Sequence, residues 1–88
     1  MKQKRVEGEF ELNEDDWYVI ELKGFRRRAG QMREVDWAGT KWVRIDMPLQ
    51  SDGSDWDIEH FHPSVIYSFH RVSEAEAFRQ ARLLIEGV

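Results

Sequence analysis

The chain has 88 residues, a length that suits one domain and leaves no room for a second hydrophobic core. It contains no cysteine, which excludes disulfides and thiolate metal sites, and its net charge of −4 argues against general binding to nucleic acid. No apolar run approaches the roughly 18 residues that a membrane span requires, and the basic start, residues 1–5, is not followed by the apolar stretch of a signal peptide. We therefore expect a cytoplasmic protein without membrane partners.

The first predicted element is a short strand over residues 6–12, preceded by residues 1–5, which we expect to be frayed. A polar turn, Asn13 to Asp16, leads into a stronger strand from Trp17 to Lys23. Alternation in this strand places Tyr18, Ile20 and Leu22 on one face, which we expect to be core.

A basic turn is predicted next, from Gly24 to Gly30. Two more strands follow, from Gln31 to Trp37 and from Lys41 to Met47, joined by a hairpin turn at Gly39. The core face of the third strand carries Val43, Ile45 and Met47.

After Pro48 the residues from Leu49 to Asp55 are mostly turn formers with little to bury. A further strand is predicted from Trp56 to His62. It should end there because Pro63 cannot donate a hydrogen bond to a neighbouring strand. The last predicted strand runs from Ser64 to Val72.

A C-terminal helix is predicted over residues 73–86. Ser73 and Glu76 have the spacing of a capping box, and Gly87 suits the position after the helix end. One arc of the helix is apolar and should pack on the sheet: Ala77, Phe78, Ala81, Leu84 and Ile85. The predicted fold is α+β, an antiparallel sheet of about five strands with one C-terminal helix packed on a face.

The second face of the sheet is unusually apolar, because it carries Trp17, Val19, Trp42 and, by position, Trp37. A face of this kind is typical of a subunit contact, so we expect a homo-oligomer that uses it. Leu83 lies outside the apolar arc of the helix and is either an ordinary exposed leucine or part of the same contact.

Three stretches of the chain resemble small accessory proteins of tailed bacteriophages and prophages: Glu21 to Glu34, Gly39 to Pro48 and Ser64 to Ala77. Those proteins show a turn of the type G-H-R-R-x-A-G, a strand end L-R-I-D-x-P, and A-I-Y-S-x-T-P-x-S-E-E before the helix. Here Phe25 replaces the histidine, and His70-Arg71 replaces the Thr-Pro pair. The resemblance implies a phage accessory protein and brings no assigned catalytic residues.

Three histidines, His60, His62 and His70, are the nearest approach to a metal site, with Asp57 or Glu59 as an oxygen ligand. The carboxylates lie at odd offsets from the histidines and hence on the opposite strand face. No serine has the context of a nucleophile elbow. We therefore expect no metal, no cofactor and no enzymatic activity.

A set of arginines and aromatic residues is the stronger binding candidate, because guanidinium groups match phosphate and aromatic faces stack on bases. Its members are Arg26, Arg27, Arg28, Arg44, Trp37, Trp42 and Tyr67. They predict a site for a small phosphorylated ligand. In the alternative interpretation the tryptophans fill a core or dimer interface and the arginines coat a turn.

Acidic residues provide a second hypothesis. Asp52, Asp55 and Asp57 lie in a stretch without Lys or Arg, and such a surface can occupy a basic groove on a host defence protein. A plain solvated loop is the simpler explanation of these residues. The sequence thus predicts a non-enzymatic phage protein in counter-defence. It either sequesters a nucleotide-type signal as an oligomer or directly inhibits a nucleic-acid-handling complex, in the manner of an anti-CRISPR.

Overall fold

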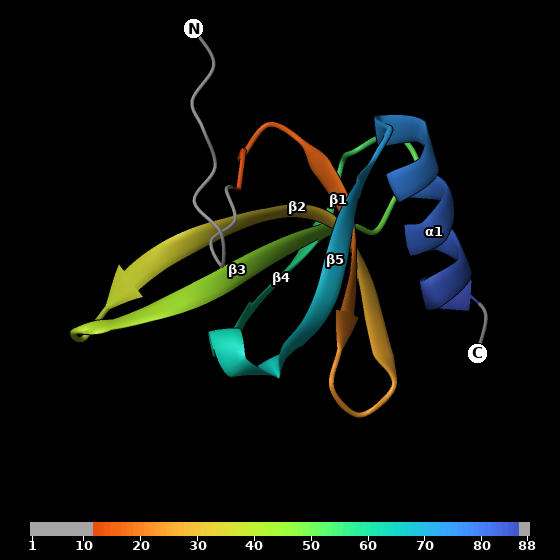
Figure 1. The fold of residues 1–88 in the computed structure, drawn as a ribbon. Helices are drawn as coiled ribbons and strands as arrows, with labels where there is room; N and C mark the ends of the chain where they lie inside the picture. The colour runs from red at the N-terminus through yellow and green to blue at the C-terminus, as the bar shows by residue number, and fades with distance from the viewer. Residues whose placement is uncertain (1–11, 87–88) are drawn as a thin grey trace, which may run out of the picture.

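The computed structural model describes residues 12–86 (Figure 1). Its elements are β1 (Trp17–Leu22), β2 (Arg26–Trp37), β3 (Thr40–Pro48), β4 (Trp56–Phe61), the short 3-10 helix η1 (Pro63–Val65), β5 (Ile66–Val72) and α1 (Glu74–Glu86). The predicted α+β fold, a five-stranded antiparallel sheet with a C-terminal helix, is confirmed. The predictions for residues 1–11 and for Gly87 lie outside the described residues.

The sheet has the strand order β4-β3-β2-β1-β5, and the long strand β2 belongs to both halves of it. Its first part, up to Gly30, pairs with β1, and its second part, from Gln31, pairs with β3. At the boundary a Cβ on residue 30 would collide with the carbonyl oxygen of Asp46. Glycine therefore allows the backbones of β2 and β3 to approach closely at the point where the two halves of the sheet meet.

The sheet is curled rather than flat. Its two edge strands, β4 and β5, follow each other in the chain with only residues 62–65 between them. Four strand spacings of a flat sheet amount to about 19 Å. A link that contains η1 spans only about 13 Å, because a 3-10 helix rises about 2 Å per residue. Figure 1 shows the result, with the β2–β3 hairpin projecting away from β1 and β5.

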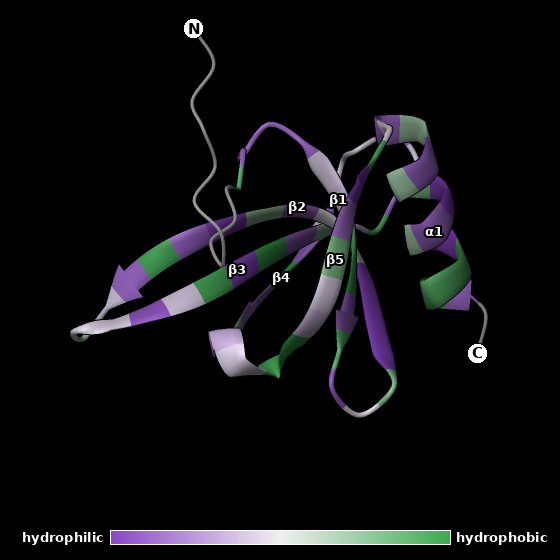
Figure 2. Cartoon of the chain, viewed as in Figure 1, coloured by the Kyte–Doolittle hydropathy of each residue, from purple (hydrophilic) through white to green (hydrophobic). Residues whose placement is uncertain are grey.

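Two hydrophobic clusters form, one on each face. The first lies within the curl and consists of Tyr18, Ile20, Leu22, Met32, Val43 and Ile45. The second lies beneath α1 and consists of Val19, Ala29, Met47 and Ala81. Figure 2 shows the alternation of hydrophobic and hydrophilic residues along β2 and β3 that produces two such faces. The predicted core face is correct except for Met47, which lies next to Gly30 and joins the second cluster.

The helix covers part of the face that we had expected to be free for self-association. Val19 is only 4% exposed, and Trp17 packs against Phe78 of α1 at 5.3 Å between ring centroids and against Trp56 at 5.9 Å. The prediction that Val19 takes part in a subunit contact is therefore wrong, because the chain's own helix covers it, whereas Trp17 is only half-buried by Phe78 and Trp56. Alternation in a strand defines two faces but does not tell which one a distant helix will cover.

The helix itself begins as predicted, although only half of the capping box forms. The Glu76 amide donates to Ser73 Oγ at 3.0 Å, whereas the Glu76 carboxylate accepts from Arg79 and Gln80 instead of the Ser73 amide. Ala77 and Ala81 are buried, but Ile85, predicted to pack, is 44% exposed. No helix in residues 12–86 is long and apolar enough to cross a membrane.

Candidate functional site

The basic turn is shorter than predicted. Only Lys23, Gly24 and Phe25 form the turn, and β2 already begins at Arg26. The reason is that the arginines have partners on other strands. Arg27 is directly opposite Glu21 in the ladder and forms an ion pair with it at 2.7 Å. A run of arginines between glycines has the composition of a loop, and these partners are not visible in the local sequence.

Arg28 is held by two hydrogen bonds to one carboxylate. Its Nε donates to Glu59 Oε1 at 2.6 Å and its Nη2 to Glu59 Oε2 at 3.2 Å, while Nη1 donates to the carbonyl of Arg27 at 2.9 Å. The hydrogen bond that Arg28 donates to Glu59 is the main reason that the pKa of Arg28 is raised, and the nearby charge of Asp57 raises it further. Arg28 is therefore fixed in place rather than free to follow a ligand.

Arg44 is committed to an internal partner as well. Its Nε and Nη2 donate to the two carboxylate oxygens of Asp46, at 2.8 and 3.0 Å. This bidentate contact is the chief cause of the raised pKa of Arg44. The predicted ligand-binding arginines thus include three, Arg27, Arg28 and Arg44, whose charges are neutralised within the chain.

Two cations remain without such a partner. Within residues 12–86, every Lys and Arg forms an ion pair with a carboxylate except Lys23 and Arg26. The two are neighbours across the β1–β2 turn, where Arg26 Nε donates to the Lys23 carbonyl at 3.2 Å. The free positive charge of the described chain is therefore concentrated at one turn.

Two phenylalanines accompany these cations. The guanidinium carbons of Arg26 and Arg28 both lie 5.9 Å from the ring centroid of Phe61, within the range of a cation–π contact. Phe25 is fully exposed, and its backbone is in the left-handed region with φ 61°. We refer to Lys23, Phe25, Arg26, Arg28, Glu59 and Phe61 as the basic turn cluster.

The other aromatic residues of the predicted site lie elsewhere. Trp37, which is 70% exposed, lines a hollow of 390 Å³ together with Val35, Asp36, Trp42 and His60. Trp42 meets Trp37 edge-on at 6.5 Å between ring centroids. The structure therefore does not bring Trp37 and Trp42 together with Arg26 and Arg28, although sequence reasoning had placed them in one site.

Tyr67 lies in a third place. It belongs to β5, is 75% exposed and lines a separate apolar groove of 430 Å³ with residues that include Met32, Val43 and Phe69. It therefore forms no common site with the arginines of β2.

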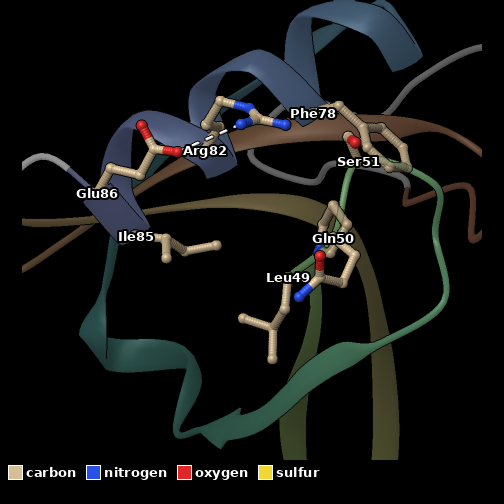
Figure 3. A pocket seen from close by; sticks show the side chains of 8 residues that line it. Leu49, Gln50, Ser51, Phe78, Arg82, Ile85 and Glu86 are labelled. Carbon is tan, nitrogen blue, oxygen red and sulfur yellow. Dashed lines mark hydrogen bonds and ion pairs between the residues drawn. The ribbon is translucent and has the colours of Figure 1, made fainter.

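The acidic stretch follows β3 and begins beside the helix. A pocket of 230 Å³ lies between this loop and α1. Figure 3 shows its lining, with Leu49, Gln50 and Ser51 of the loop opposite Phe78, Arg82, Ile85 and Glu86 of the helix. Arg82 already pairs with Glu86 at 3.3 Å, so the pocket offers no free cation.

The loop carboxylates support the backbone that carries them. Asp52 accepts a hydrogen bond from the Ser54 amide at 2.9 Å, and Asp55 accepts from the Trp56 amide at 3.0 Å. Hydrogen bonds from the Ser54 side chain and then its backbone hold the pKa of Asp52 below its usual range. This geometry explains both residues as turn formers and leaves their outer oxygens facing solvent.

The histidines do not form a metal site within residues 12–86, where no group of three or more potential ligands is close enough to hold an ion. The predicted strand end at His62 is off by one residue, because β4 ends at Phe61. His62 instead caps η1, with its Nδ1 accepting from the Ser64 amide at 3.2 Å, and contacts the ring of Trp42 edge-on.

Comparisons of the chain with models of protein families, with curated proteins and with solved structures found no match. The candidate site therefore depends on its own geometry. Sequence reasoning missed Lys23 and Phe61 as members, and it did not pair Glu59 with an arginine. The distribution of charge around residues 23–28 was the one signal that pointed to this region.

Proposed function

We propose that this chain is a non-enzymatic phage accessory protein that binds a compact nucleotide-type ligand, mole for mole, at the basic turn cluster. The observation that carries the proposal is the position of Lys23 and Arg26. These two cations lack a carboxylate partner in residues 12–86, Arg26 lies over the ring of Phe61, and the exposed Phe25 lies between the two cations in the chain.

The chemistry of the cluster suits a phosphate joined to an aromatic base. A guanidinium and an ammonium without internal partners lose no ion pair when they bind a phosphate. The exposed ring of Phe25 supplies a surface on which a base can stack, a contact that tolerates any base. Arg28 cannot leave Glu59 without breaking two hydrogen bonds, so it serves to position Phe61 and the start of β2.

The biological role that we propose is counter-defence in the host cytoplasm, by sequestering a nucleotide-type signal as an oligomer. The resemblance of the sequence to phage accessory proteins supports the setting. Trp37 and Leu83 support the assembly, because both remain exposed, at 70% and 50%, after the helix has covered Val19.

Titration calorimetry with cyclic and linear nucleotides tests the proposal. Each charge-assisted hydrogen bond should contribute about 1.5–3 kcal/mol, so Arg26→Ala should weaken binding roughly 10- to 150-fold. The matched control is Arg71→Ala, which removes an exposed arginine that pairs with Asp16 on another part of the chain. If no nucleotide binds the wild-type protein at micromolar concentration, the ligand-binding proposal must be abandoned.

A second function is favoured by the acidic residues. Asp52, Asp55 and Asp57 form no ion pair within residues 12–86, in contrast to most of the arginines. They suit contact with the basic groove of a host nucleic-acid-handling protein. If this inhibitor function is correct, changing the three aspartates to asparagine abolishes activity in cells, added salt slows association, and Arg26→Ala has no effect.

A further inference from the structure

We infer that the ligand of the basic turn cluster carries a single phosphate, as a phosphomonoester or a cyclic phosphodiester, and that Glu59 excludes nucleoside triphosphates. This inference rests on the proposed function and names the class of ligand. It follows from the number of charges at the cluster and from how firmly each one is held.

The cluster holds three cations, but only two of them are free for a ligand. Arg28 is neutralised by Glu59 through two hydrogen bonds, at 2.6 and 3.2 Å. Lys23 and Arg26 have no such partner in residues 12–86. A phosphomonoester carries about two negative charges and a phosphodiester fewer, which two free cations balance.

A triphosphate brings additional charge that the cluster does not balance. Glu59 lies beside the same Phe61 ring as Arg26, since Arg28 contacts both the carboxylate and the ring. Asp57 lies near enough to Arg28 for its charge to act on that guanidinium. Glu59 cancels the charge of Arg28, so further phosphates at this turn meet no third free cation, and the unpaired charge of Asp57 repels them.

Glu59 is not free to turn away from such a ligand. Both of its oxygens are engaged by Arg28, whose third nitrogen is held by the carbonyl of Arg27 at 2.9 Å. The side chains of Arg28 and Glu59 are only 23% and 30% exposed, so the pair is less screened than one on the open surface. A fixed carboxylate at the edge of a cationic site selects by ligand charge.

Phe25 adds a preference for an aromatic group. Phe61 is already covered by both guanidinium groups, whereas the ring of Phe25 is fully exposed and free to stack on a base. Inorganic phosphate alone should therefore bind more weakly than a nucleoside monophosphate, because it forgoes the stacking contact.

Calorimetry without added divalent cation tests the inference, with a nucleoside monophosphate, its cyclic form, the matching triphosphate and inorganic phosphate. Wild-type protein should bind the monophosphate at least roughly tenfold more tightly than the triphosphate. Glu59→Gln removes the carboxylate charge and frees Arg28, so this preference should vanish or reverse. Asp57→Asn should reduce the preference while leaving the Arg28–Glu59 contact in place, which covers the case in which Glu59→Gln fails to fold.

The matched control is Glu21→Gln, which frees Arg27 in the same way but on the opposite face of β2. It should leave the ratio of the two affinities unchanged. A wild-type protein that binds the triphosphate as tightly as the monophosphate would overturn the inference and leave nucleotide binding intact. The inference also fails if Asp57→Asn and a folded Glu59→Gln both keep the wild-type ratio. Absence of binding by every nucleotide would instead refute the proposed function, and the inference with it.

Discussion

Arg28 and Glu59 are joined across two strands that are not neighbours in the sheet. Their contact distances are 2.6 Å from Nε to Oε1 and 3.2 Å from Nη2 to Oε2, and the residues are 31 positions apart in the chain. Strand β3 lies between β2 and β4, so no ladder hydrogen bond connects the two strands that carry this pair. The side chains therefore connect the edge strand β4 directly to β2.

This pair should be energetically coupled. Arg28→Met and Glu59→Gln should each destabilise the fold, and the double variant should lose less than the two single losses combined. We expect a coupling energy of about 1 kcal/mol from urea unfolding, because the contact is bidentate and its side chains are less than one-third exposed. The more exposed pair Arg82–Glu86 is the control, with about 0.3 kcal/mol expected for an i, i+4 pair on a helix. Purely additive losses at Arg28 and Glu59 would contradict the prediction.

Gly30 should tolerate no side chain. In Gly30→Ala the new methyl group collides with the Asp46 carbonyl, so β2 and β3 must separate, at a cost of about 3 kcal/mol or more. Gly39→Ala is the control, because residue 39 also has a positive φ, of 78°, but has open space around it, and about 1 kcal/mol is expected there. Equal losses of unfolding free energy in the two variants would show that the close approach at Gly30 is unimportant.

Glu76 should make the helix sensitive to acid. Hydrogen bonds from Arg79 and then Gln80 lower the pKa of Glu76 from 4.5 to about 2. A carboxyl with a lowered pKa stabilises the fold above its unfolded pKa, and this contribution is lost as pH falls towards 2. At pH 6 the thermal unfolding midpoint of wild type should therefore be higher than that of Glu76→Gln. The difference between the two midpoints should disappear as the pH falls from 4.5 to 2. Glu74→Gln is the control, because Glu74 lies in the same helical turn but accepts no hydrogen bond from Arg79. If its midpoint differs from that of wild type with the same pH dependence, the effect belongs to the helix in general.

Phe25 should lower the free energy of unfolding of the protein in the absence of ligand. Its backbone is left-handed at φ 61°, which costs a residue with a Cβ about 1–2 kcal/mol, and its ring is fully exposed. Phe25→Gly should therefore raise the unfolding free energy by about 0.5–1 kcal/mol, while it weakens nucleotide binding. Denaturation in urea measures the first effect and calorimetry the second. A loss of stability would indicate that the ring has a structural role in the monomer.

Trp37 should be central to self-association. Light scattering should report a mass above the 10.5 kDa of one chain, and Trp37→Glu should reduce it to that of a monomer with an unchanged circular dichroism spectrum. Tyr67→Glu serves as the control, because it places the same charge on another exposed aromatic residue in a separate groove. A wild-type protein that is monomeric at micromolar concentration would rule out the assembly.

The order of strands and helix was predictable because most apolar residues alternate clearly. Tyr18, Ile20 and Leu22 on one strand and Val43 and Ile45 on another identify a common buried face, and all five are buried. Ser73 marks the helix start because a serine at that position satisfies an amide that the helix leaves free. These features depend on residues close together in the chain.

The candidate site was harder to predict because its members are joined by distant contacts. Glu59 neutralises Arg28 from another strand, and Asp46 neutralises Arg44, so most of the arginines that resemble a phosphate site are not free. The remaining free cations, Lys23 and Arg26, are recognised only after every ion pair is known. For the same reason the helix position could not be foreseen, since Ala81 and Val19 are far apart in the chain.

The contact between Val19 and Ala81 affects how the chain folds during translation. Ribosomes synthesise β1 before α1, so during translation the strand emerges without the helix that covers it. The pairing of β1 with β5 also waits for residues 66–72. The nascent protein therefore exposes Val19, Ala29 and Met47 until β5 and α1 have emerged from the ribosome. Cells that lack holdase chaperones should accordingly accumulate aggregates of this chain when it is truncated before residue 74.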